Sequence, residues 1–177
     1  ISNHSSGKMG YSLAETALSL GAEVKLISGP TSQSVSSKNI KIIHIKTGKE
    51  LLEAIIEDYT DSDIVIMAAA VSDYKPVKFS KKKIKKDNNK LNIQLEKTTD
   101  ILFELGKNKK NQILVGFALE NNEELLNAKN KLEKKNLDLI VLNSLNDKGA
   151  GFNHDTNKIT IVDYLGKVTP YKLKKKQ

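Results

Sequence analysis

A short anion-binding pattern lies near the start of the chain, where residues 5–8 read Ser-Ser-Gly-Lys ahead of a helical pattern. The first backbone N–H groups of a helix have no partner within it, and together with the helix dipole they attract negative charge. Two hydroxyls and an ammonium add donors, which suits a phosphate. An ordinary serine cap with a glycine turn explains the same residues equally well. The pattern is not a P-loop, because Asn3 stands where its first glycine should be and Met9 replaces its Ser or Thr.

A second candidate follows an apolar stretch, where residues 68–74 read Ala-Ala-Ala-Val-Ser-Asp-Tyr. Small residues at the carboxyl end of a central strand allow a ligand to approach the backbone closely. Asp73 then suits Mg²⁺ or a ribose. Capping of a turn by Asp73 is the competing interpretation.

The third candidate is a basic segment, residues 81–86, which reads Lys-Lys-Lys-Ile-Lys-Lys and precedes Asp-Asn-Asn. Such a segment is too polar to pack and is usually a solvated loop. As a mobile lid it would instead place ammonium groups on a triphosphate and exclude water on closing.

Two weaker signals come later in the chain. Phe117 ends an apolar stretch beside Gly116, which suits a base or sugar contact but equally plain core packing. Lys131 and Lys135 are four residues apart and share one face of a predicted helix, where a surface role is the simpler explanation. The three histidines show no metal-ligand spacing.

Periodic patterns indicate the elements that position these residues. Apolar residues spaced three and four apart predict a helix over residues 8–20, ended by Gly21, and Thr47 with Glu50 forms a capping box that begins a second helix. Short, mainly apolar stretches predict strands over residues 24–27, 40–45, 113–117 and 139–142. Residues 64–70 lack alternation, which predicts a strand covered on both faces in the middle of a parallel sheet.

The remaining segments complete an alternation of strands and helices. Residues 91–95 alternate like a half-exposed strand, residues 100–105 and 123–135 favour helices, and residues 159–162 and 168–171 predict a hairpin. We therefore expect an α/β fold with a doubly wound, mostly parallel Rossmann-like sheet and a C-terminal β-hairpin appendage.

Composition limits the class of protein. A chain of 177 residues is the size of one α/β domain, and the lack of cysteine excludes disulfides and thiolate metal sites. The net charge of +8 comes from 29 lysines without one arginine, which makes base-reading contacts to nucleic acid a weak expectation. The longest apolar run, residues 64–71, is too short to span a membrane, so we expect no membrane partner. With the composition described above, we also expect a cytoplasmic protein without a nucleic-acid partner.

Taken together, the segments closely resemble phosphopantothenoylcysteine synthetase, the ligase half of a bacterial bifunctional flavoprotein whose other half is a decarboxylase. Residues 1–10 resemble the first loop and helix of that family, residues 68–74 its A-A-A-V-x-D-Y segment, and residues 83–86 its K-I-K-K flap. The likeness continues through residues 115–120, 131–143 and 151–157.

The resemblance implies a ligase that joins 4'-phosphopantothenate to L-cysteine through an acyl-cytidylate made from CTP, with Mg²⁺. It implies that Asn3 contacts the acyl group as a catalytic and substrate-binding residue and that Lys83 acts catalytically from the flap. The implied nucleotide-binding residues are Ser6, Gly7, Lys8, Ala70, Asp73, Lys83, Asp100, Ile101, Phe117, Lys131 and Lys135. Asp73 is the candidate metal contact.

The family pattern also extends beyond residue 1. Its Gly-rich turn and first strand lie upstream of Ile1, so we expect a single domain over residues 1–177 without that strand and with a flexible basic flap at about residues 75–90. Residues 98–101 read Thr-Thr-Asp-Ile where the family usually has Asn-Pro-Asp-Ile. The resemblance further implies a homodimer and a decarboxylase that is fused to it or acts as its partner.

Two other functions remain open on sequence grounds. An NAD(P)-dependent Rossmann-type oxidoreductase shares the expected fold, although the G-x-G-x-x-G fingerprint is missing from the sequence. A basic nucleic-acid-binding module is the alternative without catalysis, and its binding would fall steeply with salt.

Overall fold

The computed structural model describes residues 5–78, 80, 82, 91–120, 122–144 and 156–175. The helices are α1 (Lys8–Ser19), α2 (Gly48–Asp58), the 3-10 helix η1 (Tyr59–Asp61), α3 (Ile101–Lys107) and α4 (Glu124–Lys134). The strands are β1 (Val24–Ser28), β2 (Ile40–His44), β3 (Ile64–Met67), β4 (Tyr74–Pro76), β5 (Leu95–Lys97), β6 (Ile113–Glu120), β7 (Leu139–Ser144), β8 (Thr156–Asn157), β9 (Ile159–Asp163), β10 (Val168–Pro170) and β11 (Lys174–Lys175).

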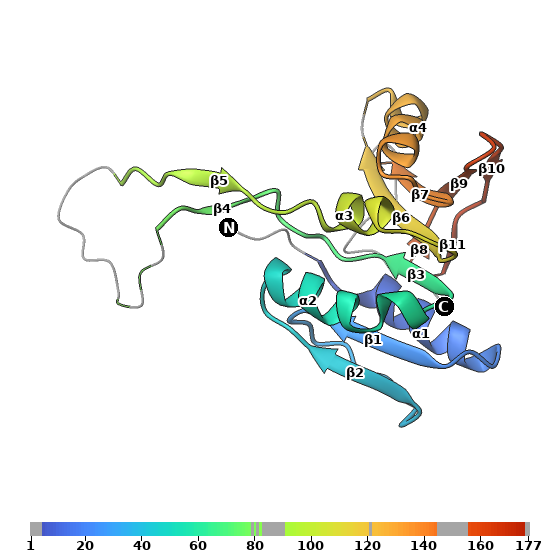
Figure 1. Cartoon of the computed structure of the whole chain (residues 1–177). Coiled ribbons are helices and arrows are strands. Elements are labelled where there is room, and N and C mark those ends of the chain that lie inside the picture. The colour runs from blue at the N-terminus through green and yellow to red at the C-terminus, as the bar shows by residue number, and fades with distance from the viewer. Residues whose placement is uncertain are drawn as a thin grey trace.

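A five-stranded sheet with the order β10-β9-β7-β6-β3 forms the centre of the molecule (Figure 1). β3, β6 and β7 are parallel, whereas β9 runs antiparallel to β7 and to β10. The predicted α/β class with a mostly parallel sheet is confirmed. The predicted C-terminal hairpin is confirmed as well, and through β9 it continues the central sheet.

The first two strands form a sheet of their own. β1 and β2 pair in parallel, and α1 packs against both of them. The helical face predicted from apolar spacing buries Tyr11 and Ala14, and the Tyr11 hydroxyl lies 3.0 Å from Ser28 Oγ at the end of β1. The predicted cap of α2 is confirmed, because Thr47 Oγ1 accepts from the Glu50 amide. The Glu50 carboxylate accepts in return from the amide of Lys46, the residue before the cap.

The predicted position of β3 in the middle of the sheet is wrong. β3 pairs with β6 and ends the sheet order, and the side chains of Ile64 and Ile66 are 56% and 43% exposed. A run of apolar residues reports only composition, and it does not determine whether both faces of the strand are covered. Cover depends on which strands and helices come to lie beside it, and that is decided by tertiary structure.

The alternating segment at residues 91–95 also differs from its prediction. Only its last residue enters a strand, β5, which pairs with β4 in an antiparallel ribbon. Leu91, Ile93 and Leu95 are all exposed rather than half-buried. Figure 1 shows this ribbon extending away from the two sheets. Residues 79, 81 and 83–90, most of the predicted flap, lie outside the described residues.

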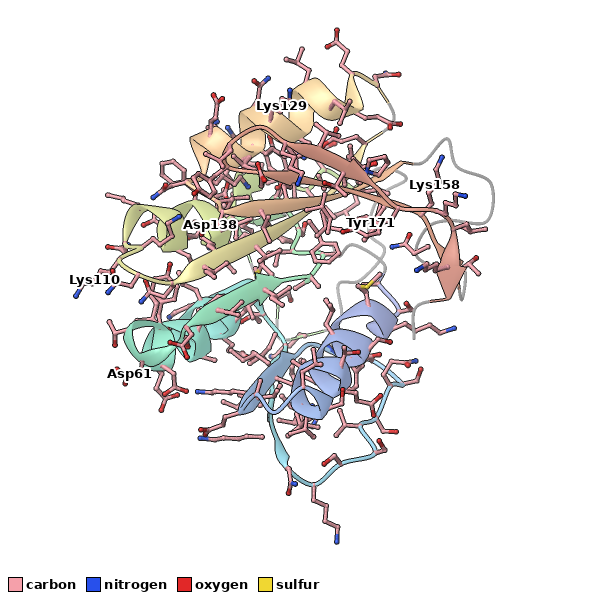
Figure 2. The ribbon with its side chains drawn as sticks, turned by 90° about the vertical axis from the view of Figure 1, so that its right-hand side faces the viewer. Asp61, Lys110, Lys129, Asp138, Lys158 and Tyr171 are labelled. Atoms are coloured by element: carbon pink, nitrogen blue, oxygen red, sulfur yellow. The ribbon has the colours of Figure 1, made fainter. Side chains whose placement is uncertain are left out.

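The amino ends of the parallel strands gather at one end of the molecule. Asp61, Lys110 and Asp138 precede β3, β6 and β7, and Figure 2 shows all three on the same side. The carboxyl ends, where doubly wound sheets bind ligands, therefore lie at the opposite end. None of the described helices has both the length and the hydropathy that a membrane crossing needs.

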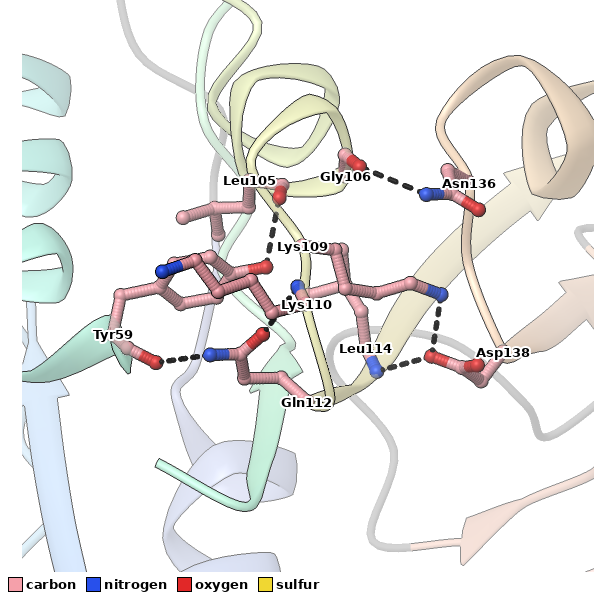
Figure 3. Close-up of polar contacts among 9 residues, drawn as sticks. All are labelled: Tyr59, Leu105, Gly106, Lys109, Lys110, Gln112, Leu114, Asn136 and Asp138. Carbon is pink, nitrogen blue, oxygen red and sulfur yellow. Dashed lines mark hydrogen bonds and ion pairs between the residues drawn. The ribbon is translucent and has the colours of Figure 1, made fainter. Parts of the chain in front are cut away.

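A hydrogen-bond network fixes this amino end (Figure 3). The Tyr59 hydroxyl donates to the Leu105 carbonyl at 2.7 Å, and the buried Gln112 amide donates to the Tyr59 carbonyl at 2.9 Å. Asp138 Oδ2 accepts from the Leu114 amide and from Lys109 Nζ. Burial raises the pKa of the Tyr59 hydroxyl, and the nearby Asp138 carboxylate adds to the rise. The network joins η1, α3 and β6, and the residues that form these bonds are not among the predicted site residues.

Candidate nucleotide site

The turn that begins α1 is shaped by a glycine. Gly7 is the N-cap with φ 75°, a left-handed conformation that disfavours other residues. A Cβ on Gly7 would lie 2.7 Å from Thr31 Oγ1, and that hydroxyl donates to the Ser6 carbonyl at 2.9 Å. The cap is therefore the glycine and not a serine. Ser6, Gly7 and Lys8 are half-buried. The start of a helix is a general site for anion binding, because its first amides have no partner within the helix.

A shallow cavity of about 230 Å³ adjoins this turn. It is lined by residues 28–31 and 44–46, which follow the carboxyl ends of β1 and β2. Thr31 is shared between the cavity wall and the Gly7 turn. The sequence did not predict this cavity, because its two lining segments are far apart in the chain and are brought together by the β1–β2 pairing.

The Asp73 turn is tied to the start of α3. The Thr98 amide donates to the Asp73 carbonyl at 2.9 Å, and the Thr98 hydroxyl donates to the Ser72 carbonyl at 2.6 Å. Asp100 is the N-cap of α3, where its Oδ1 accepts from the Phe103 amide at 3.1 Å. The departure from the family pattern at residue 98 therefore supplies one side-chain contact to this turn, the hydroxyl bond to the Ser72 carbonyl.

Lys135 is held beside Asp100 by close packing of helices. Lys135 Nζ lies 2.9 Å from Asp100 Oδ2, and a Cβ on Gly106 would lie 1.8 Å from the Lys135 carbonyl oxygen. Only a glycine allows α3 to approach the end of α4 this closely. Asn136 Nδ2 also donates to the Gly106 carbonyl at 2.9 Å, as Figure 3 shows.

Lys131 forms an ion pair with a residue that sequence reasoning did not select. Its Nζ lies 2.5 Å from Oε1 of Glu120, the last residue of β6. Asn127 Nδ2 approaches the other oxygen, Oε2, at 3.4 Å. The sequence signal for this pair is the carboxylate of Glu120 at the end of an apolar strand, with Asn127 and Lys131 four residues apart on the helix that follows.

The structure thus brings one group of predicted residues together and places the others separately. Asp73 follows β3, Asp100 caps the start of α3, and Lys131 and Lys135 lie on and at the end of α4. Asp73 is bonded to Thr98, two residues before Asp100, and Asp100 is paired with Lys135. The predicted turn at Ser6, Gly7 and Lys8 lies against Thr31 in the β1–β2 part. Asn3 and Lys83 lie outside the described residues.

Three apolar or small candidates have different surroundings. Phe117 is half-buried on β6 and Ala70 is half-buried after β3, so both offer surface to a ligand. Ile101 is only 3% exposed and belongs to the core, which leaves its backbone amide, at the first position of α3, as its one group suited to a ligand.

Comparison with known proteins places these features in a family. The family model described as the DNA/pantothenate metabolism flavoprotein C-terminal domain, DFP, matches residues 1–177. The chain belongs to this family. A protein called cysteine/cysteine sulfinic acid decarboxylase, from an unknown prokaryotic organism, is 51% identical over 99% of this DFP chain and 49% of its own length. The coenzyme A biosynthesis bifunctional protein CoaBC of Bacillus subtilis is 48% identical over 91% of this chain and 40% of its own length.

Solved structures agree with this assignment. The crystal structure of the C-terminal domain of a CoaBC protein has 37% sequence identity and a TM-score of 0.82, over 98% of this chain and 77% of that one. A DNA/pantothenate metabolism flavoprotein from Streptococcus pneumoniae has 26% identity and a TM-score of 0.84, over 97% and 83% of the two chains. This DFP chain spans half or less of the length of the curated relatives described above.

Proposed function

We propose that this chain is a phosphopantothenate–cysteine ligase that activates the carboxylate of 4'-phosphopantothenate with CTP and joins it to L-cysteine. The observation that carries the proposal is the pair of lysines on and just after α4, Lys131 and Lys135, each of which lies beside a carboxylate in a DFP-family chain. The coenzyme A biosynthesis names of several relatives support the substrate class.

The reaction has two balanced steps. A carboxylate oxygen of 4'-phosphopantothenate attacks the α-phosphorus of CTP, and pyrophosphate leaves to give an acyl-cytidylate. The amine of cysteine then attacks the acyl carbon, loses a proton, and CMP leaves. Both steps need negative charge to be neutralised and groups to be held in place, which lysine ammonium groups and backbone amides do well.

Several of the described residues have a place in this scheme. Lys131 and Lys135 neutralise phosphate charge, the amides at Gly7 and Lys8 bind an anionic oxygen, and Phe117 offers a flat surface to the base. Asn3 and Lys83 would act on the acyl group and on the triphosphate.

The residues present fit Mg²⁺ only as an ion carried mainly by the nucleotide. Within the described residues, no group of three or more acidic or histidine side chains gathers in a way that could hold a metal. Asp73 is exposed and supplies at most one ligand, as is common for Mg²⁺ bound with substrate phosphates. When bound, the ion would neutralise charge on the triphosphate.

Pyrophosphate release tests the proposal. We expect release on mixing the protein with 4'-phosphopantothenate, CTP and Mg²⁺, limited to about one turnover without cysteine and continuous with it. ATP should support much slower turnover. Pyrophosphate release that does not depend on 4'-phosphopantothenate would contradict the proposal, and so would hydride transfer to a nicotinamide cofactor. Equal specificity constants for CTP and ATP would contradict only the proposed preference for CTP.

The longer relatives bear on the partners of this chain. One is named as bifunctional and the other as a decarboxylase, and each is at least twice as long as the matched region. We therefore propose that a decarboxylase domain accompanies this one, fused or as a separate chain, and that both act in the cytoplasm. A reading frame that encodes both domains would support fusion, and copurification of a decarboxylase with this chain would support a separate partner.

A further inference from the structure

Glu120 is an acidic residue that the proposed reaction does not use, yet it lies within the lysine cluster. It is the last residue of β6, and its side chain is only 13% exposed, whereas the side chain of its partner Lys131 is 44% exposed. A carboxylate that is not paired with a cation would repel a triphosphate bound beside it, because like charges repel. Its burial there needs a reason.

The contacts of Glu120 are aimed at α4. Oε1 accepts from Lys131 Nζ and Oε2 faces Asn127 Nδ2, so that both oxygens meet residues on one face of the helix. A carboxylate this far from water is stable only when it is paired. An ammonium has three N–H donors, and this pair uses one of them, which leaves donors for a phosphate.

The pair differs from a surface ion pair on α2. Lys49 and Glu53 lie 3.7 Å apart with side chains 84% and 62% exposed, and such pairs contribute little because water screens them and both side chains move. Glu120 is anchored at a strand end by comparison, so it fixes where the ammonium of Lys131 lies. The structure thus contains a natural control within the same chain.

We propose that Glu120 is a positioning residue of the nucleotide site, which acts on CTP only through Lys131. The inference rests on the proposed function. Without Glu120 the Lys131 side chain loses its fixed position, and without Lys131 the Glu120 carboxylate is left unpaired and repels the phosphates. The two defects are therefore not independent.

This dependence predicts that a second substitution, at Glu120, restores part of the CTP affinity that is lost when Lys131 is replaced. Glu120→Gln should weaken CTP binding about fivefold. Lys131→Gln should weaken CTP binding about thirtyfold, because this substitution removes the Lys131 ammonium and also leaves the Glu120 carboxylate unpaired. The double variant should bind better than Lys131→Gln alone, at about five- to tenfold weaker than wild type. A purely structural role for Glu120 gives no such recovery.

Calorimetric titration of the full chain with CTP and Mg²⁺, repeated with ATP, measures these affinities, and thermal melting follows stability. Glu53→Gln is the matched control and should bind like wild type. Additive losses in the double variant, or unchanged binding by Glu120→Gln, would overturn the inference while leaving the ligase proposal standing. A wild-type chain that binds neither nucleotide would overturn both.

A second comparison covers the case in which Lys131→Gln is too unstable to titrate. Glu120→Asp keeps the charge on a shorter side chain, so its affinity for CTP should lie closer to wild type than that of Glu120→Gln. Equal losses in the two Glu120 variants would show that the carboxylate does not position Lys131.

Discussion

Tyr59 shows how a single buried hydroxyl connects structure to pH. Its pKa is raised by burial, and its hydrogen bond to the Leu105 carbonyl joins η1 to α3. A raised pKa means that the folded state keeps the proton longer than the unfolded state. The contribution of Tyr59 is therefore complete below its ordinary pKa of about 10 and is lost as pH rises through the folded value.

Tyr59→Phe should consequently lower stability by about 1 kcal/mol at neutral pH, the usual worth of one hydrogen bond. Above pH 10 the difference between wild type and variant should shrink, because the wild-type tyrosine is then penalised for remaining neutral. Urea unfolding at pH 7 and pH 10.5 measures both. A difference that stays constant across this range would show that the hydroxyl does not titrate with folding.

Lys83 remains a prediction of the sequence alone. If its ammonium meets negative charge in the transition state, Lys83→Gln should leave the melting temperature unchanged and slow pyrophosphate release roughly a hundredfold, as for loss of one oxyanion donor. Its neighbour Lys82 lies outside the matched flap motif and controls for charge alone. Equal small losses in Lys83→Gln and Lys82→Gln, reproduced by added salt, would identify the segment as a solvated run.

At the scale of elements, the approach of α3 to the end of α4 decides where Lys135 lies. Gly106→Ala should destabilise the protein by about 2–3 kcal/mol, because the new Cβ would meet the Lys135 carbonyl and force the helices apart. The same substitution at Gly10 in α1, where a Cβ would have open space, should stabilise by about 0.5–1 kcal/mol. Unfolding curves compare the two, and equal effects would refute the packing argument.

Local patterns predicted the elements well and their surroundings poorly. The spacing of apolar residues in α1, the Thr47 cap and the Asp100 cap act within a few residues of themselves, and each was predictable. The exposure of Ile64 depends on the strand order, which no local pattern encodes. The pairing of Glu120 with Lys131 likewise depends on α4 folding back over β6.

At the scale of the whole molecule, exposed apolar side chains support the predicted homodimer. Tyr164 and Leu165, at the turn between β9 and β10, are 67% and 77% exposed, and the β4–β5 ribbon also carries exposed apolar residues. Grouped exposure of this kind marks interaction surfaces. We therefore expect a dimer in which the hairpin and the ribbon take part.

Light scattering checks this expectation. Tyr164→Ser combined with Leu165→Ser should weaken dimerisation about tenfold or more, whereas Leu20→Ser, at a single residue 82% exposed at the end of α1, should not. An active wild-type monomer at working concentration would contradict the prediction.

Within the described residues β3 pairs on one side only, which has a consequence for the behaviour of this chain in solution. The unpaired backbone groups of a strand at the edge of a sheet can form hydrogen bonds with a strand of another molecule. The exposed side chains of Ile64 and Ile66 would add apolar contact to such an association. The net charge of +8 keeps molecules apart over the Debye length, which falls from about 10 Å at 0.1 M salt to about 3 Å at 1 M. Colloidal stability of the isolated chain should therefore be set by ionic strength, with turbidity growing as salt is added even while the fold itself stays intact.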